Sequence, residues 1–276
     1  MTFQDIILRK EDHIATIVFN RPEKLNALTR RMMEEVETAI SDVANDNNVR
    51  VLVLTGEGRA FCSGADFNFS DIREGKVKPR LAEELGRHSE ENWRQGRLLS
   101  MLARATSALQ HLDKPTIAMI RGDVVGGGFG LALACDMRVG ADNARFMVGY
   151  PRVGSVPNMG EMWLLPHIVG LGKTLELIMT SEFCSAEEAY RIGLLNRLVA
   201  PDQLEKETMK LANGLMKIPP ITQRFLKMHI YGALGSSLET SMAFSSACNF
   251  ILNRSEDGDE AIRALAEKRA PVFKNG

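Results

Sequence analysis

The stretch Thr116-Ile-Ala-Met-Ile-Arg-Gly-Asp-Val-Val-Gly-Gly-Gly-Phe-Gly-Leu-Ala-Leu-Ala-Cys-Asp136 decides how the rest of the chain is interpreted. Its first five residues are apolar and largely β-branched, as in a buried strand, and the residues after the triple glycine (126–128) suit a buried helix. We therefore expect a helix that begins at or beside the glycines. A helix start offers free backbone N–H groups and a partial positive charge, and glycine lets a ligand approach closely. The turn is either an oxyanion site or only a close packing point between helix and strand.

The composition is that of a globular protein without a strong overall charge. The 276 residues include 34 Lys and Arg against 35 Asp and Glu, a net charge of −1, so we expect no nucleic-acid partner. The four cysteines are far apart and form no CxxC pair, which favours free thiols in a reducing compartment. The N-terminus is polar and no apolar run approaches 18 residues. We expect neither signal peptide nor membrane span, and a cytoplasmic location.

The order of the expected elements indicates an α/β fold with a helical C-terminal part. The expected strands are Ile6–Arg9, Ile14–Phe19, Val51–Leu54, Thr116–Ile120, Met137–Gly140 and Asn196–Val199. The segment from Thr29 to about residue 45 and most of residues 81–112 have helical character, and strands that alternate with such helices pair in parallel. From Glu161 onwards the chain is almost wholly helical. We divide it into an α/β core, residues 1–200, and a helical C-terminal region, residues 201–276.

Several catalytic and binding motifs are absent. Gly170-Leu-Gly-Lys-Thr174 imitates the end of a phosphate-binding loop, but His167 replaces the glycine that this motif needs. The triple glycine does not fit the dinucleotide-binding pattern, there is no G-x-S-x-G, and the five histidines lack metal-binding spacing. We expect no metal and no permanently bound cofactor.

Two glycine loops follow strands that we expect to be neighbours. One is Phe61-Cys-Ser-Gly-Ala-Asp66, and the other contains the triple glycine. Ligands of open α/β sheets collect at the carboxyl ends of the strands. If the loops converge there, the backbone N–H groups of Ser63 and Gly127 could both bind one oxygen and stabilise an enolate or a tetrahedral intermediate.

These loops belong to a set of stretches that resembles the crotonase superfamily, also called the enoyl-CoA hydratase/isomerase family. The matching stretches run in family order over nearly the whole chain: Asn20-Arg-Pro-Glu-Lys-Leu-Asn-Ala27, Phe61 to Asp66, Lys114 to Ala118, Gly126 to Gly128, Ala134-Cys-Asp136, Thr180 to Gly193, and Glu267-Lys-Arg-Ala-Pro-Val-Phe273. Each is weakly specific by itself, and together they are very specific. The resemblance implies a spiral of ββα units, with a helical C-terminal region that covers sites and makes contacts in a homotrimer or a dimer of trimers.

The resemblance also implies an acyl-CoA thioester as the substrate, with coenzyme A present only as part of it. The thioester oxygen would lie between the N–H groups of Ser63 and Gly127. Coenzyme A contacts carry over to Lys24, Leu25, Ala65 and Asp66, and to Lys268 and Phe273, the last two from a neighbouring subunit.

The chain departs from the hydratases of this family at both catalytic glutamate positions. Counted without gaps, those positions hold Gly130 and Tyr150, neither of which can act as a carboxylate base. Other members place an aspartate where this chain has Asn158, or a tyrosine in the same segment. Asn158 and Tyr150 remain candidates for polar contacts with the substrate. Glu161 is the candidate acid or base, or else simply a first-turn residue favoured by the helix dipole.

Acidic and basic residues of the expected pocket wall are further candidates, although a solvated helix face explains each of them better: His88, Glu90, Glu91 and Arg94. We therefore expect an acyl-CoA enzyme with a variant reaction: isomerisation, C–C cleavage or decarboxylation. The alternatives are a true hydratase with a relocated acid/base and a CoA-ester binding protein without activity. The sequence does not fix the acyl group.

Overall fold

The computed structural model describes residues 2–66 and 101–274. A six-stranded sheet forms the centre, and a three-stranded sheet lies beside it. The strands of the large sheet, in spatial order, are β1 (Ile6–Glu11), β2 (Ile14–Phe19), β3 (Val51–Gly56), β4 (Thr116–Ile120), β6 (Met137–Ala141) and β9 (Arg197–Val199). The small sheet consists of β5 (Asp123–Val125), β7 (Arg145–Met147) and β8 (Cys184–Ser185). Only β1 is antiparallel to its neighbour in the large sheet, so the prediction of parallel pairing is confirmed.

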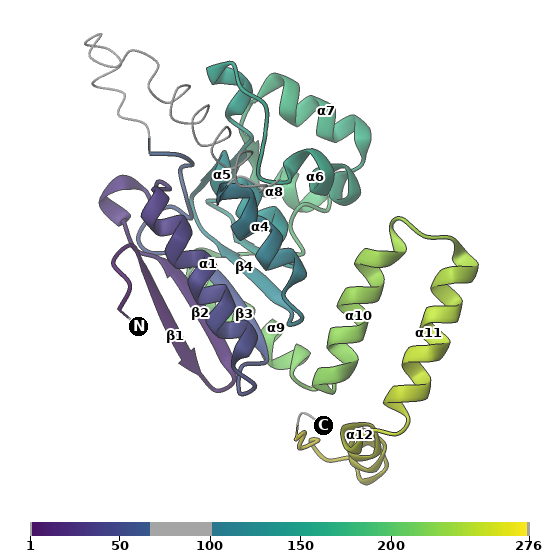
Figure 1. The fold of residues 1–276 in the computed structure, drawn as a ribbon. Helices are drawn as coiled ribbons and strands as arrows, with labels where there is room; N and C mark the ends of the chain where they lie inside the picture. Colours follow the sequence, from purple (N-terminus) through teal and green to yellow (C-terminus); the bar gives the residue numbers. More distant parts are fainter. Residues whose placement is uncertain (1, 67–100, 275–276) are drawn as a thin grey trace, which may run out of the picture.

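Helices cover both faces of the large sheet. The α-helices are α1 (Arg30–Asn45), α4 (Met101–His111), α5 (Gly127–Ala134), α6 (Glu161–Val169), α7 (Leu171–Thr180), α8 (Ala186–Arg191), α9 (Leu204–Leu215), α10 (Pro220–Ala233), α11 (Leu238–Leu252) and α12 (Glu256–Glu267). Short 3-10 helices span η1 (Pro22–Lys24), η2 (Tyr150–Val153) and η3 (Pro201–Gln203). Figure 1 shows α1 and α4 side by side on one face. Because side chains alternate along a strand, Leu52 and Leu54 pack toward those helices, whereas Val51 and Val53 pack toward α9.

The local signals in the sequence explain the beginnings of these elements. Thr29 caps α1, since its side chain accepts a hydrogen bond of 3.0 Å from the Met32 N–H. Asp12 and His13 form the turn of the β1–β2 hairpin with positive φ values of 48° and 67°. Helix α5 begins at Gly127, directly inside the triple glycine, as the sequence predicts. The small three-stranded sheet was not predicted.

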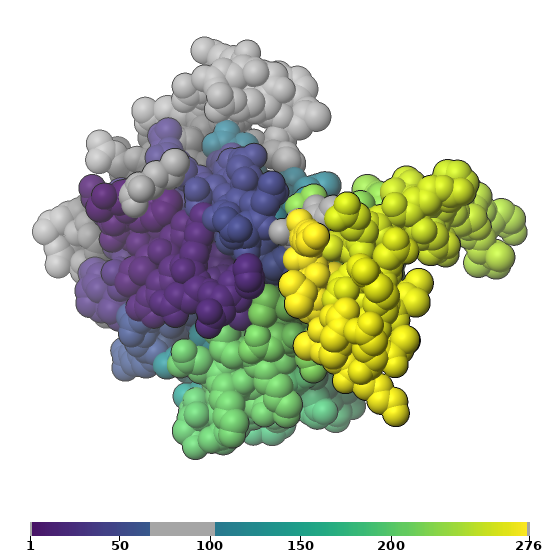
Figure 2. Space-filling model, turned by 90° about the horizontal axis from the view of Figure 1, so that it is seen from below, coloured from purple at the N-terminus to yellow at the C-terminus, as the bar shows by residue number. Residues whose placement is uncertain are grey.

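Helices α10, α11 and α12 extend away from the body of the molecule (Figure 1), and the C-terminal residues, in yellow, project from one side of it (Figure 2). One buried polar cluster connects α10 to the core. Asp136 pairs with Lys227 at 2.9 Å, accepts a hydrogen bond of 2.9 Å from the Tyr231 hydroxyl and accepts another from the Thr116 N–H. By contrast, α9 packs directly on the sheet, so residues 204–215 are part of the same core as the strands. The division at residue 200 stays a prediction.

Candidate active site

The two glycine loops lie against each other at the carboxyl ends of the central strands. The Cys62 N–H donates to the Asp123 carbonyl (3.1 Å), and the Val125 N–H donates to the Cys62 carbonyl (2.9 Å). A Cβ atom on Gly64, whose φ is +89°, would lie 3.0 Å from the Val125 carbonyl oxygen. Glycine is required here because the two backbones approach too closely for a side chain.

The start of α5 offers backbone donors at this junction. Gly127 is the first residue of the helix, and its N–H has no acceptor within the described residues. The Gly126 carbonyl already accepts the N–H groups of Phe129 and Gly130. A helix start of this kind attracts negative charge, so the Gly127 N–H is able to bind an oxyanion, and its role as a donor stays a prediction.

The predicted second donor, Ser63, requires correction. Its N–H donates a hydrogen bond of 3.0 Å to the Leu25 carbonyl and is therefore not free to bind a ligand oxygen. Two residues further on, the Ala65 N–H has no acceptor in the part of the chain that the structure describes, while its neighbours pair with Leu28 on the other side. Ala65 is exposed, so its N–H is the available donor in this loop.

Glu161 lies at the same site, at the first position of α6. It is 0% exposed. Its Oε2 accepts a hydrogen bond of 2.8 Å from the Met159 N–H, and its Oε1 has no hydrogen-bond partner among the described residues. Burial raises the pKa of this carboxyl above its ordinary value, an effect that its hydrogen bonds and the neighbouring Tyr150 oppose. The carboxyl is therefore easier to protonate than an exposed glutamate.

The position of Glu161 is related to the missing side chain at position 130. A Cβ atom on Gly130 would lie 2.8 Å from Glu161 Oε1 and 2.6 Å from Met159 Cβ. Ordinary contacts begin near 3.4 Å. The carboxylate of residue 161 thus occupies space that a side chain at position 130 would need. Two strands, β6 and β7, lie between the two residues along the chain, and the sequence pattern does not indicate that they meet. The only hint was a glycine inside a helix, which commonly has a packing reason.

Tyr150 lies beside the glycines at the start of α5 and interacts with Glu161. Its hydroxyl is 3.8 Å from the point where a Cβ of Gly127 would lie, and its ring is 4.0 Å from the equivalent point of Gly126. Burial and the interaction with Glu161 raise the pKa of the Tyr150 hydroxyl. Hence Gly127, Tyr150 and Glu161, which come from three different segments, meet in one place.

The remaining predicted residues are not part of this cluster. Asn158 is exposed and makes no polar contact with the described residues. Lys24 is exposed, Leu25 is partly exposed beside it, and Asp66 forms an ion pair of 2.9 Å with Arg21. The pocket-wall candidates His88, Glu90, Glu91 and Arg94 lie outside the described residues.

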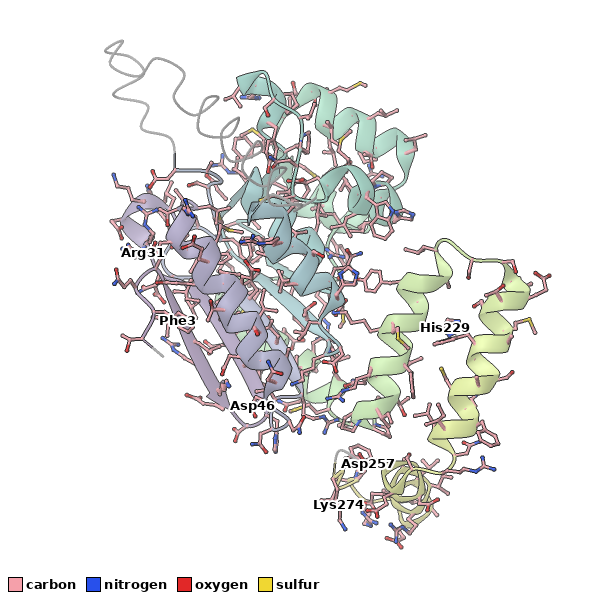
Figure 3. All side chains as sticks on the ribbon, viewed as in Figure 1. Phe3, Arg31, Asp46, His229, Asp257 and Lys274 are labelled. Carbon is pink, nitrogen blue, oxygen red and sulfur yellow. The ribbon has the colours of Figure 1, made fainter. Side chains whose placement is uncertain are left out.

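Lys268 and Phe273 lie at the opposite end of the molecule from α5 and α6. Figure 1 places the C-terminus beside α12, below α10, and Figure 3 shows Lys274 close to Asp257 there. The Lys274 N–H donates to Asp257 at 2.7 Å, and the Phe273 ring lies 5.6 Å from the Arg50 guanidinium. These residues therefore cannot reach the cluster of their own chain.

Comparison with known proteins agrees with the fold. A family model for enoyl-CoA hydratase/isomerase matches residues 9–276. The short-chain-enoyl-CoA hydratase of Clostridium acetobutylicum is 33% identical over 280 residues, which cover 100% of both chains. The chain belongs to the enoyl-CoA hydratase/isomerase family. Its members are enzymes that act on acyl-CoA thioesters.

Relatives within the enoyl-CoA hydratase/isomerase family carry different names. The 1,2-epoxyphenylacetyl-CoA isomerase of Escherichia coli is 30% identical over 268 residues, covering 97% of each chain. The crystal structure of an enoyl-CoA hydratase from Bacillus anthracis superposes with a TM-score of 0.87 at 29% identity, covering 99% of this chain and 100% of that one. The predicted crotonase fold is confirmed. In the part of the chain that is described, no helix is long and apolar enough to cross a membrane, and no group of acidic, His or Cys residues could hold a metal ion.

Proposed function

We propose that this protein transfers a proton at the α-carbon of an acyl-CoA thioester by way of an enolate. The thioester oxygen binds to the N–H groups of Gly127 and Ala65, and Glu161 supplies or accepts the proton. The observation that carries this proposal is the buried Glu161 carboxylate, with one oxygen unpartnered in the described structure, beside the helix start that carries the free Gly127 N–H. One oxyanion donor typically contributes about 2.7–4 kcal/mol to the stabilisation of the transition state.

A single carboxylate suits isomerisation best among the reactions open to this family. Isomerisation removes a proton from one carbon and returns it to another, so one group can perform both steps. Decarboxylation and C–C cleavage also pass through an enolate, and a protonated Glu161 would quench it. Its raised pKa favours that protonated form.

Hydration is the second candidate, because one observation favours it. Glu161 Oε1 lies within contact distance of the Gly130 position, where the hydratases carry one glutamate. Tyr150 occupies the position of the other. In this reaction Glu161 would take the role of the first glutamate and Tyr150 would orient the water.

The rest of the binding site follows from the same proposal. Lys24, Leu25 and Asp66 lie near the loop that carries Ala65 and form part of the coenzyme A contact surface. Lys268 and Phe273 come from a neighbouring subunit of a homotrimer or a dimer of trimers, since they lie far from the cluster of their own chain. The enzyme needs no permanently bound cofactor and works in the cytoplasm.

Deuterium uptake at the α-carbon tests this proposal. The wild type and Glu161→Gln are incubated in heavy water with saturated, unsaturated and 3-hydroxy acyl-CoAs, and both uptake and products are followed by mass spectrometry. Gln keeps an oxygen for the Met159 N–H but cannot transfer the proton, so we expect uptake to fall at least 100-fold. Glu182→Gln, a change at an exposed position, is the matched control and should keep full uptake.

The products separate the candidate reactions. A shifted double bond supports isomerisation, and interconversion of enoyl-CoA and 3-hydroxyacyl-CoA supports hydration. Binding of acyl-CoA without uptake or turnover of any tested substrate would overturn the proposal in favour of a binding protein.

A further inference from the structure

The Glu161 carboxylate is fully buried, and this limits what a bound substrate can contact. It is 0% exposed, one oxygen is held by the Met159 N–H, and the other lies against the backbone of α5 at Gly130. The Met159 side chain, which is also 0% exposed, packs on the same part of α5. An acyl group bound to the start of α5 thus meets another residue before it meets this carboxylate.

That residue is Tyr150, which is only partly buried. Its hydroxyl lies 3.8 Å from the point where a Cβ of Gly127 would lie, and Glu161 Oε1 lies 2.8 Å from the equivalent point of Gly130, three residues further along α5. The segment around it is held firmly: the Gly149 N–H donates to Ser181 Oγ (3.0 Å), and the Ser155 N–H donates to the Tyr150 carbonyl (3.1 Å). The backbone that carries the Tyr150 ring is therefore held in place beside the start of α5, on the part of the helix against which the Glu161 carboxylate also lies.

We propose that Tyr150 is the catalytic residue that contacts the acyl group, and that it relays the proton between the α-carbon and Glu161. This inference rests on the proposed function above. In the protonation step the hydroxyl O–H bond breaks as a C–H bond forms from the enolate electron pair, and the thioester C=O bond is restored. The Glu161 carboxyl gives its own proton to the phenolic oxygen and becomes a carboxylate. Removal of a proton follows the same path in reverse.

The electrostatics of the pair agree with a concerted relay. Burial and the charge of Glu161 raise the pKa of Tyr150, so a free phenolate is unfavourable at this position. The pKa of Glu161 is also raised, so the carboxyl can hold the proton that the phenol needs. Because both protons move together, the phenol never becomes a phenolate, and the negative charge of the enolate ends on the Glu161 carboxylate, one oxygen of which the Met159 N–H stabilises.

The test compares Tyr150→Phe, Glu161→Gln and the double variant in the deuterium-uptake assay, with binding of a non-reactive acyl-CoA measured separately. Tyr150→Phe keeps the ring and its packing. We expect uptake to fall at least 100-fold in each single variant and no further in the double variant, since the two groups act in series. Acyl-CoA binding should change less than threefold. Tyr190→Phe, at an exposed tyrosine, is the control and should behave as the wild type.

A second measurement separates a relay from a merely structural role of the ring. Incorporation of 3-fluorotyrosine at position 150 makes the phenol more acidic with little change in shape, and it should shift the pH profile of uptake to lower pH. Near-normal uptake in Tyr150→Phe, together with loss in Glu161→Gln, would overturn the relay and leave the proposed function intact, with Glu161 acting directly. Absence of uptake in the wild type would overturn both.

Discussion

Substitution of Gly130 by alanine tests the central geometric observation, the proximity of Gly130 and Glu161. The added methyl group would lie 2.8 Å from Glu161 Oε1, 2.6 Å from Met159 Cβ and 3.1 Å from the Met159 carbonyl oxygen. To reach ordinary contact distances, the carboxylate oxygen must retreat by about 0.6 Å and Met159 Cβ by about 0.8 Å. Two of these three atoms belong to Met159, one of them to its backbone, so side-chain rotation alone cannot relieve the contact.

The expected effect on stability is the difference between two opposing terms. Alanine is favoured over glycine in a helix by up to about 1 kcal/mol. Overpacking of a rigid interior costs about 1–3 kcal/mol. We therefore expect Gly130→Ala to lower the free energy of unfolding by up to about 2 kcal/mol. A displacement of the carboxylate by a large fraction of an ångström should lower α-proton exchange on the order of 100-fold.

The control for Gly130→Ala is another helical glycine. Gly172 lies in α7, and a Cβ atom there would meet nothing within 4 Å. Gly172→Ala should raise the free energy of unfolding by up to about 1 kcal/mol and leave exchange unchanged. Urea unfolding and deuterium uptake measure both quantities on the same samples. Wild-type exchange in Gly130→Ala would refute the reasoning, because the displaced carboxylate would then have no part in the proton transfer.

Three further predictions concern the donors, the C-terminal helices and the pH dependence. Ser63→Ala should leave exchange and stability nearly unchanged, because it removes only a hydroxyl that donates a long hydrogen bond of 3.4 Å to the Lys24 carbonyl; a large loss of exchange would give this hydroxyl a part in the reaction. Asp136→Asn should lower the free energy of unfolding by about 3–5 kcal/mol, because Lys227, with a side chain only 8% exposed, loses its partner. The exposed pair between Arg224 of α10 and Asp113, which precedes β4, gives the control Asp113→Asn, which should cost less than about 1 kcal/mol. Finally, Glu161 has a higher pKa in the folded than in the unfolded protein, so the native state binds more protons. The free energy of unfolding should fall as the pH rises from the unfolded pKa of Glu161 to its folded pKa, and Glu161→Gln should remove that part of the slope in urea unfolding at a series of pH values.

Local signals in the sequence predict the elements that depend on nearby residues. The strand before the triple glycine, the helix start at Gly127 and the helix from Thr29 to about residue 45 each follow from a few adjacent side chains, and the structure confirms them. The three-stranded sheet could not be predicted in this way. Its strands have two or three residues each, which is too short for an alternating pattern, and they are defined by partners far along the chain.

In the candidate site, too, the sequence does not predict contacts that depend on how distant segments pack. The two loops could be paired from their glycines, but the choice between Ser63 and Ala65 depends on which N–H points toward Leu25, a matter of backbone direction that the sequence does not reveal. Glu161 could be named as an acid, whereas its burial and its distance from Gly130 depend on how α6 packs on α5.

The contact between positions 130 and 161 restricts which residues they can carry together. A glutamate at position 130 would begin with a Cβ 2.8 Å from the present carboxylate, so two carboxyl groups would share one buried volume. Two carboxyl groups that share a buried volume resist being ionised together, so one of the two would be held in its protonated form. The site therefore favours a single ionised carboxylate, from α5 or from α6. Because α5 also carries the oxyanion donor while α6 does not, a carboxylate on α6 can move relative to the bound thioester without disturbing the Gly127 N–H. Under the proposed function, the acid/base can thus change position between α5 and α6 while the backbone donor that would stabilise the enolate stays the same.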